Sequence, residues 1–296
     1  MDKYWELTKT LTIRVNQETV NDFLLSLKLS HCSRGTVIQY RRFLERFFGD
    51  MNEPFFSISS ETILHWFRDH QIHVKETTLQ LRFSILSSFF TFCLKEELLK
   101  RSPMKSRWYP RLPQPVPKYL EKEEIAKTRQ QSESISIRNQ ALIEFMLTSG
   151  CRVSEVHGLN LKDIDLPNRT AKVMGKGKKI RYVHFTDKCA VLFEEYLLIR
   201  EKEATTSAFF VSSTTTKRLS IRMIQQLLNN VGEMANLPTK LHPHRLRHTF
   251  ATELLAKGAD LSFISDELGH SNLSTTQIYA RLPKREIISL YRKYMG

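Results

Sequence analysis

Cysteine is scarce in this chain of 296 residues, and the four cysteines stand far apart. No two of them form a Cys-x-x-Cys pair, and each lies in an apolar or helical context. This spacing argues against a dense disulfide framework and favours reduced, buried thiols, as is usual in the cytoplasm. The residues concerned are Cys32, Cys93, Cys151 and Cys189.

Long hydrophobic runs are also missing. No stretch approaches the length needed to cross a bilayer, which argues against a membrane-spanning helix. Residues 1–5 contain no apolar segment of the kind found in a secretory signal. Internal repeats are absent, and the one low-complexity tract is the short threonine run 214–216. We therefore expect a cytoplasmic protein with no membrane partner.

Acidic residues are outnumbered: 31 Asp and Glu stand against 45 Lys and Arg, which gives a formal net charge of +14. Such an excess favours a polyanionic partner, because each cationic side chain placed on a phosphate releases condensed counterions. A basic protein without such a partner has the same composition, so charge alone leaves both interpretations open. The hydrophobic share of 41% is ordinary for a globular chain, and the length suffices for two domains, each with its own core.

Residues 1–102 have the apolar spacing of helices and no strand alternation. Helical patterns begin after Asn16, after Ser33, which can act as an N-cap, and after Ser60. A longer pattern runs over about 76–98. The sequence predicts a compact helical bundle in this part of the chain.

A proline-rich, basic stretch follows over 103–118. Proline lacks a backbone donor and keeps the preceding residue out of the α region, so an extended linker is expected here. Such a linker can join two lobes that close around a rod-shaped ligand; a loop that covers a single domain is the alternative. The prolines are Pro103, Pro110, Pro113, Pro115 and Pro117.

The remaining residues, 119–296, have a mixed pattern. A helix expected over 137–148 ends at Gly150, a typical C-cap residue. Three short strands separated by tight turns then indicate a small antiparallel sheet. The strands are expected near Ile164, at 171–174 and at 180–185, and further helices at 190–200, 220–235, 245–257, 261–268 and 284–294. The predicted fold class is mainly α with a small antiparallel β-sheet.

Two arginines in this half are suited to a phosphodiester under attack. Such a phosphate gains negative charge on its non-bridging oxygens, and a planar guanidinium offers two parallel N–H donors to it. Arg247 lies three residues after His244, so both side chains share one helix face. Arg152 follows a glycine-ended helix and stands at the start of the next, where anions are favoured. Either arginine alone is more often a surface residue, but the two together favour a phosphate site.

Tyr279 is the candidate nucleophile. A phenol is almost wholly protonated at neutral pH, so it needs a proton acceptor nearby, and His244 and His270 are candidates. Beside Ile278, Tyr279 can also be read as a packing residue, but its position shortly after His270 favours catalysis. Glu155 is expected to pair with a basic neighbour and to fix its rotamer.

Five segments in this half resemble the tyrosine recombinase (phage integrase) family, and within it the short, two-domain Xer-type recombinases. The segments, in family order, are Thr148-Ser149-Gly150-Cys151-Arg152-Val153-Ser154-Glu155, Gly175-Lys176-Gly177-Lys178, His244-Arg245-Leu246-Arg247-His248-Thr249-Phe250-Ala251-Thr252, Leu268-Gly269-His270-Ser271 and Thr275-Thr276-Gln277-Ile278-Tyr279. The resemblance implies a SAM-like core-binding domain ahead of a mixed α/β catalytic domain. Two positions depart from the common pattern: Cys151 stands where leucine is commoner, and His184 where the hairpin often has proline.

The resemblance also implies a catalytic set. Tyr279 would form a 3′-phosphotyrosyl bond and release a 5′-hydroxyl, and Lys176 would protonate the leaving 5′-oxygen. Lys178 and Lys179 compete with Lys176 for this role, and a solvated basic turn is the plainer alternative. The covalent bond keeps the energy of the phosphodiester, so neither ATP nor a metal or other cofactor is implied. The implied catalytic residues are Arg152, Lys176, His244, Arg247, His270 and Tyr279.

Further basic residues are expected to contact DNA phosphates, with base-edge contacts adding sequence choice. His242 and His244 have a spacing that suits metal ligands, but no nearby carboxylate or cysteine completes a set, so no metal site is expected. His248 is expected to make a structural hydrogen bond. The residues expected to bind DNA are Arg41, Arg42, Arg82, Lys105, Arg107, Lys178 and Lys179.

The resemblance implies a site-specific recombinase that acts on duplex DNA at the nucleoid through a Holliday junction. It would work as a homo-tetramer, or as a hetero-tetramer with a related recombinase, and an accessory activator is a further candidate partner. The helix at 284–294 would fold back or dock into a neighbouring protomer. Chromosome-dimer resolution, transposon or plasmid resolution and phage-like integration stay open, although the lack of an arm-binding domain before Asn16 favours an Xer-like role.

Three other functions stay open from the sequence. A topoisomerase-like enzyme would use the same tyrosine chemistry on one strand without exchange. A DNA-binding accessory protein would keep this fold without activity, although the intact catalytic set argues against it. A metal-dependent nuclease is disfavoured because carboxylate clusters are lacking.

Overall fold

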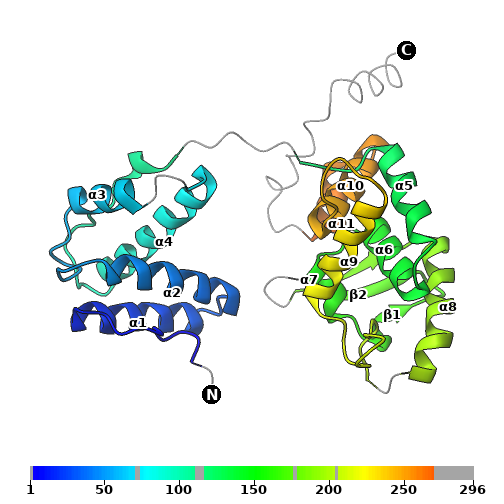
Figure 1. Cartoon of the computed structure of the whole chain (residues 1–296), viewed down its shortest axis with the longest axis horizontal. Helices are drawn as coiled ribbons and strands as arrows, with labels where there is room; N and C mark the ends of the chain where they lie inside the picture. The colour runs from blue at the N-terminus through cyan, green and yellow to red at the C-terminus, as the bar shows by residue number, and fades with distance from the viewer. Residues whose placement is uncertain (1–2, 71–73, 111–116, 176–178, 204–205, 270–296) are drawn as a thin grey trace, which may run out of the picture. The chain divides into compact units, whose positions relative to one another are not determined.

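The computed structural model describes residues 3–70, 74–110, 117–175, 179–203 and 206–269. The chain divides into two compact units, Met1–Gln114 and Pro115–Gly296 (Figure 1). Each unit has a hydrophobic core of its own. The division falls within the proline-rich stretch.

The first unit is helical. Ser33 caps the second helix, where its side chain accepts a hydrogen bond from the Thr36 backbone N–H. The fourth helix ends three residues earlier than expected because Glu97 adopts a left-handed conformation with φ 58°, and the Leu98 N–H turns back to the Cys93 carbonyl. The helices are α1 (Arg14–Leu29), α2 (Arg34–Gly49), α3 (Ser60–His70) and α4 (Glu76–Lys95).

Phenylalanine dominates the core of the first unit. The rings of Phe48 and Phe89 are fully buried and meet edge to face, with centroids 4.9 Å apart, a geometry that aromatic pairs favour. Past α4, a short 3₁₀ turn (Ser106–Trp108) brings Trp108 and Tyr109 against the same core. The Tyr109 hydroxyl donates to the Phe83 carbonyl at 3.3 Å. Residues 106–109 therefore pack with the first unit.

The second unit contains a three-stranded antiparallel sheet in the order β1-β2-β3. Its strands are β1 (Ile164–Asp165), β2 (Thr170–Met174) and β3 (Ile180–His184). Ala171 pairs with Val183 and Val173 pairs with Arg181. Ala171, Val173 and Val183 are buried and turn one face of the sheet to the core. The expected class, mainly α with a small antiparallel sheet, is confirmed.

Helices pack on the core side of this sheet (Figure 1), while Met174, Ile180 and Tyr182 on its other face are exposed. Most of them lie where the sequence predicted, but α5 was not predicted; the expected helix at 284–294 falls outside the described residues. Glu121 and Glu124 form a capping box at the start of α5. The helices are α5 (Lys122–Ser132), α6 (Ile137–Ser149), α7 (Val153–Gly158), α8 (Asp187–Glu203), α9 (Ile221–Met234), α10 (Pro243–Ala256) and α11 (Leu261–Leu268).

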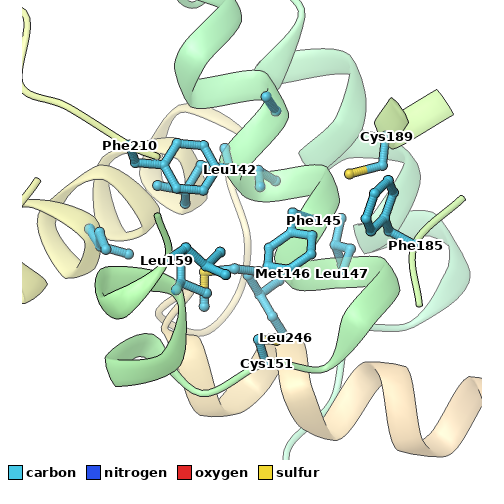
Figure 2. Close-up of a cluster of buried hydrophobic side chains, with 14 of the residues drawn as sticks. Leu142, Phe145, Met146, Leu147, Cys151, Leu159, Phe185, Cys189, Phe210 and Leu246 are labelled. Atoms are coloured by element: carbon cyan, nitrogen blue, oxygen red, sulfur yellow. The ribbon is translucent and has the colours of Figure 1, made fainter. Parts of the chain in front are cut away.

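The core of the second unit is built around α6, whose residues 141–147 are all buried. Figure 2 shows Phe145, Met146 and their neighbours in this cluster, together with Cys151 and Leu246. Cys151 directly precedes Arg152, and Leu246 directly precedes Arg247. Both arginines are therefore anchored to the core by the residue before them.

All four cysteines are free, and three of them are buried. Burial raises the pKa of the Cys93 and Cys151 thiols to about 12, which makes them poor nucleophiles at neutral pH. Within the described residues, no helix combines the length and the apolar character that crossing a membrane requires.

Candidate active site

A tight turn between α6 and α7 places Arg152. Gly150 ends α6 in the left-handed conformation, with φ 61°, and Arg152 follows as the N-cap of α7. A Cβ at Gly150 would lie 2.3 Å from Phe250 Cδ1, so α10 approaches the turn closely enough to require glycine. The turn and α10 are thereby held together.

The Arg152 guanidinium is 28% exposed and reaches across to the end of α11. Its Nη1 donates to Glu155 Oε1 at 3.0 Å and to the Leu268 carbonyl at 3.4 Å, and Nη2 donates to the Gly269 carbonyl at 3.4 Å. The carbonyls at a helix C-terminus carry partial negative charge. The end of α11 is therefore a natural resting place for a guanidinium.

Arg247 reaches the same place from α10. Its residue is only 4% exposed, and its Nη1 donates to the Gly150 carbonyl at 2.7 Å. Its Nη2 donates to the Leu268 carbonyl at 2.6 Å. Arg152 and Arg247 lie 95 residues apart in sequence, yet both donate to one carbonyl oxygen. The fold thus brings together the two arginines that the sequence singled out.

Glu155 lies beneath Arg152 with a fully buried side chain. Burial by itself raises the pKa of this carboxyl, but hydrogen bonds and charge from Arg181, and then from Arg152, hold the pKa below its usual value. Glu155 is therefore ionised at neutral pH.

Three histidines lie at the start of α10. His244 is exposed, on the helix face of Arg247, while His242 caps the helix by accepting from the Arg245 N–H at 3.2 Å. Burial, together with the neighbouring charges of His244 and Arg247, lowers the pKa of His248 to about 4. His248 is therefore neutral near pH 7, and His244 is exposed while His242 is engaged as the helix cap. Among the described residues, no group of three His, Cys, Asp or Glu side chains could hold a metal ion.

The other proposed catalytic residues, Lys176, His270 and Tyr279, lie outside the described residues, as does Lys178. Their neighbours in sequence are described. Gly175 ends the described part of the β2–β3 turn, with its N–H donating to the Lys179 carbonyl at 2.8 Å. Gly269 caps α11 in the left-handed conformation, with φ 62°.

Among the basic residues expected to bind DNA, Arg42 and Arg82 line one groove of about 600 Å³ between α2 and α4, together with Arg46. Burial, followed by the charge of Arg46, lowers the pKa of Arg82. Arg41 is differently placed: its Nη1 donates to the carbonyls of Tyr4 and Glu6, both at 3.3 Å. Three further members of that set are exposed: Lys105, Arg107 and Lys179.

Arg181 and Glu267 join the site without having been predicted. Arg181 binds Glu155 through two hydrogen bonds, and the Glu267 carboxylate lies 3.0 Å from His184 Nδ1. The sequence does contain a signal for Arg181. It stands two residues before Val183 in a strand, so both side chains lie on the same face of the sheet, and that of Val183 is buried.

Comparison with known proteins identifies the family. The sequence profile of the phage integrase family matches residues 118–286. Tyrosine recombinase XerC of Oceanobacillus iheyensis is 33% identical over 288 residues, which are 95% of this chain and 87% of that protein. The chain belongs to the phage integrase family of tyrosine recombinases. Members of this family cleave and rejoin DNA, so the chain is an enzyme of that class.

Other relatives agree with this assignment. XerC of Bacillus subtilis is 36% identical to this recombinase over 227 residues, covering 73% of this chain and 74% of that one. The crystal structure of the XerH site-specific recombinase bound to its palindromic difH substrate matches the fold with a TM-score of 0.74. That match covers 99% of this chain and 93% of the other at 21% identity, and it shows a shared fold.

Proposed function

We propose that this chain is a site-specific recombinase that cleaves and rejoins duplex DNA through a 3′-phosphotyrosyl intermediate on Tyr279. The observation that supports this most directly is the convergence of Arg152 and Arg247 on the Leu268 carbonyl. Two guanidinium groups that share one oxygen acceptor are spaced to share a phosphate.

The arginines bind the scissile phosphate in this proposal. Non-bridging oxygens of the phosphate take over hydrogen bonds that the carbonyls of Leu268 and Gly269 now accept, chiefly those from the partly exposed Arg152. The two positive charges stabilise the extra negative charge of the five-coordinate transition state. His244, which is exposed on the same helix face as Arg247, donates a hydrogen bond to the phosphate or accepts the phenolic proton of Tyr279.

The covalent step exchanges one ester bond for another. The Tyr279 oxygen attacks phosphorus and forms a P–O bond, while its phenolic proton passes to His244 or His270. The bond from phosphorus to the 5′-oxygen breaks, and Lys176 gives that oxygen a proton. A 5′-hydroxyl from another strand then reverses the step and releases Tyr279, so no ATP is consumed.

The assembly that we propose is a tetramer that holds two DNA sites. Either four copies of this chain or two copies with two of a related recombinase would exchange strands in pairs, through a Holliday junction. Arg42, Arg82 and the exposed basic residues would bind the DNA backbone. Because its substrate is chromosomal or mobile-element DNA, the protein would act in the cytoplasm at the nucleoid. Xer-like resolution and mobile-element integration or excision are both compatible with this chemistry.

The test is covalent trapping. Duplexes retained by the full-length protein would be selected from a randomised library, then nicked one base from the candidate cleavage position and labelled. Incubation with a chelator throughout should give a protein–DNA adduct for wild type and none for Tyr279→Phe, which still binds the same duplex.

Each alternative has its own outcome. Cleavage that requires a divalent cation and leaves no adduct would indicate a nuclease. Binding without any adduct would indicate an accessory protein. An adduct that relaxes supercoiled DNA without joining two sites would indicate a topoisomerase-like enzyme.

A further inference from the structure

Arg181 occupies an unusual place for a charged residue. It is the second residue of β3, opposite Val173, and its side chain lies on the same face of the strand as the buried Val183. Its side chain is 14% exposed. A guanidinium in such a place needs protein partners, because a buried and unpaired charge is strongly unfavourable.

Glu155 is the main partner. Arg181 Nη1 donates to Oε1 at 2.5 Å and Nη2 donates to Oε2 at 3.0 Å. The same two oxygens accept from Arg152, Oε1 from Nη1 at 3.0 Å and Oε2 from the backbone N–H at 2.7 Å. The carboxylate is therefore shared, and Arg181 fixes the acceptor on which the orientation of Arg152 depends.

This sharing decides how much charge Arg152 can offer to DNA. Two guanidinium groups and one carboxylate leave a net positive charge, which Arg152 presents at the exposed end of the cluster. Without Arg181, Glu155 and Arg152 would neutralise each other. A charge-assisted pair would then compete directly with a phosphate for Arg152.

Arg181 also contacts the end of α11. Its Nε donates to the Glu267 carbonyl at 3.1 Å. A Cβ at Gly269 would lie 2.9 Å from Arg181 Cδ, so the arginine side chain lies directly against this glycine. Gly269 immediately precedes His270 in the chain.

The ion pair lies close to the β2–β3 turn as well. A Cβ at Gly175 would lie 3.4 Å from Glu155 Oε1 and 3.6 Å from Arg181 Nη1. Gly175 immediately precedes Lys176 in the chain. The Arg181–Glu155 pair therefore lies between the chain segments that lead to several proposed catalytic residues.

We propose that Arg181 is a positioning residue for DNA cleavage, which acts through Glu155 to orient Arg152 and to preserve its positive charge for the scissile phosphate. The proposal rests on the proposed function. Arg181 does not touch DNA in this mechanism, because each of its three guanidinium nitrogens donates to a protein oxygen.

The first experiment compares cleavage and binding on the selected, nicked duplex with the full-length protein. Arg181→Met should cleave about 10- to 100-fold more slowly, the usual cost of removing a group that orients a reacting one, with a DNA Kd within about twofold of wild type. The matched control is Arg129→Met, which breaks a similar two-bond pair, with Glu144, at 3.0 and 2.8 Å. Arg129→Met should cleave at the wild-type rate. A wild-type rate for Arg181→Met would overturn the proposal.

Two further variants distinguish positioning from a structural role. Arg181→Lys keeps the charge but loses the two-pronged geometry, so it should cleave at an intermediate rate. Adding Glu155→Gln to Arg181→Met removes the competing negative charge, so the double variant should cleave faster than Arg181→Met alone. If the double variant instead cleaved more slowly than Arg181→Met, because the losses from the two substitutions multiply, Arg181 would not act through Glu155.

The proposal can be separated from the proposed function by a measurement without DNA. The ¹⁵N–¹H signal of the Arg152 Nε–H group, assigned with Arg152→Lys, reports the order of that side chain. Arg181→Met should shift and broaden it, whereas Arg129→Met should not. An unchanged signal would overturn the positioning role even if wild type forms no adduct; a lack of adduct with a shifted signal would overturn the proposed function alone.

Discussion

Gly150 lies where the end of α6, a packing contact with Phe250 and the Arg247 side chain meet. Its φ of 61° is in the left-handed region, where a side chain is disfavoured. The ring of Phe250 occupies the space that a Cβ would need, and the Gly150 carbonyl accepts from Arg247. Any side chain here would strain the backbone and move α10 away from the turn.

Gly150→Ala should therefore destabilise the protein by about 2–4 kcal/mol, combining left-handed strain with overpacking. Urea unfolding followed by circular dichroism measures this. The control is Gly158→Ala, because a Cβ at Gly158 meets no atom within 4 Å; that variant should be within about 1 kcal/mol of wild type. Equal stability of the two variants would refute the packing argument.

The roles of residues that depend on their sequence neighbours could be predicted from the sequence, whereas roles that depend on a partner far away in sequence could not. Gly150 as a C-cap and Ser33 as an N-cap each follow from a few neighbouring residues, and both functions are present in the structure. Arg181 needs a partner 26 residues away on another element. Its role depends on an ion pair between β3 and α7, which no local pattern specifies.

At the scale of elements, α5 shows why a polar helix is missed when helices are predicted from the spacing of apolar residues. Only Ile125, Thr128 and Ser132 are buried along it, so its apolar periodicity is weak. Besides Ile125, which joins the hydrophobic core, ion pairs attach it. Arg245 of α10 donates to both Glu124 oxygens at 2.7 Å, and its side chain is 4% exposed.

Arg245→Met should cost about 3–5 kcal/mol of unfolding free energy, because it leaves the Glu124 carboxylate buried without its cation. Adding Glu124→Gln should recover much of that loss. The comparison variant is Arg14→Met, whose exposed partner is Glu18; because a solvent-exposed ion pair contributes little to stability, this variant should unfold close to wild type. Urea unfolding of all three variants measures the loss of unfolding free energy. Similar losses for Arg245→Met and Arg14→Met would contradict the prediction.

At the scale of the whole molecule, the two units carry different kinds of positive surface. The first presents an open groove lined by Arg42, Arg46 and Arg82. In the second, Arg152 and Arg247 both donate to one carbonyl oxygen, that of Leu268. An open basic groove suits a continuous phosphate backbone, and a convergent arginine pair suits one phosphate.

Salt should reveal the groove's share of DNA binding. Replacing Arg42, Arg46 and Arg82 together with alanine should weaken binding and flatten the plot of log K against log salt by about 0.9 for each phosphate that the groove no longer neutralises. Arg169→Ala is the control, because that arginine already pairs with Asp187. Fluorescence anisotropy between about 50 and 200 mM salt, a range over which such binding weakens steeply, measures both slopes. An unchanged slope in the triple variant would remove the groove from the DNA interface.

The two active-site arginines differ in how firmly the protein holds them. Arg247 is buried and makes hydrogen bonds of 2.6 and 2.7 Å, whereas Arg152 is partly exposed and reaches the carbonyls of Leu268 and Gly269 at 3.4 Å. In the proposed mechanism, one guanidinium is thus preset and the other adjusts to the phosphate. Within this arginine pair, the proposed mechanism needs only the Arg152 side chain to move on DNA binding, which keeps the energetic cost of engaging the substrate low.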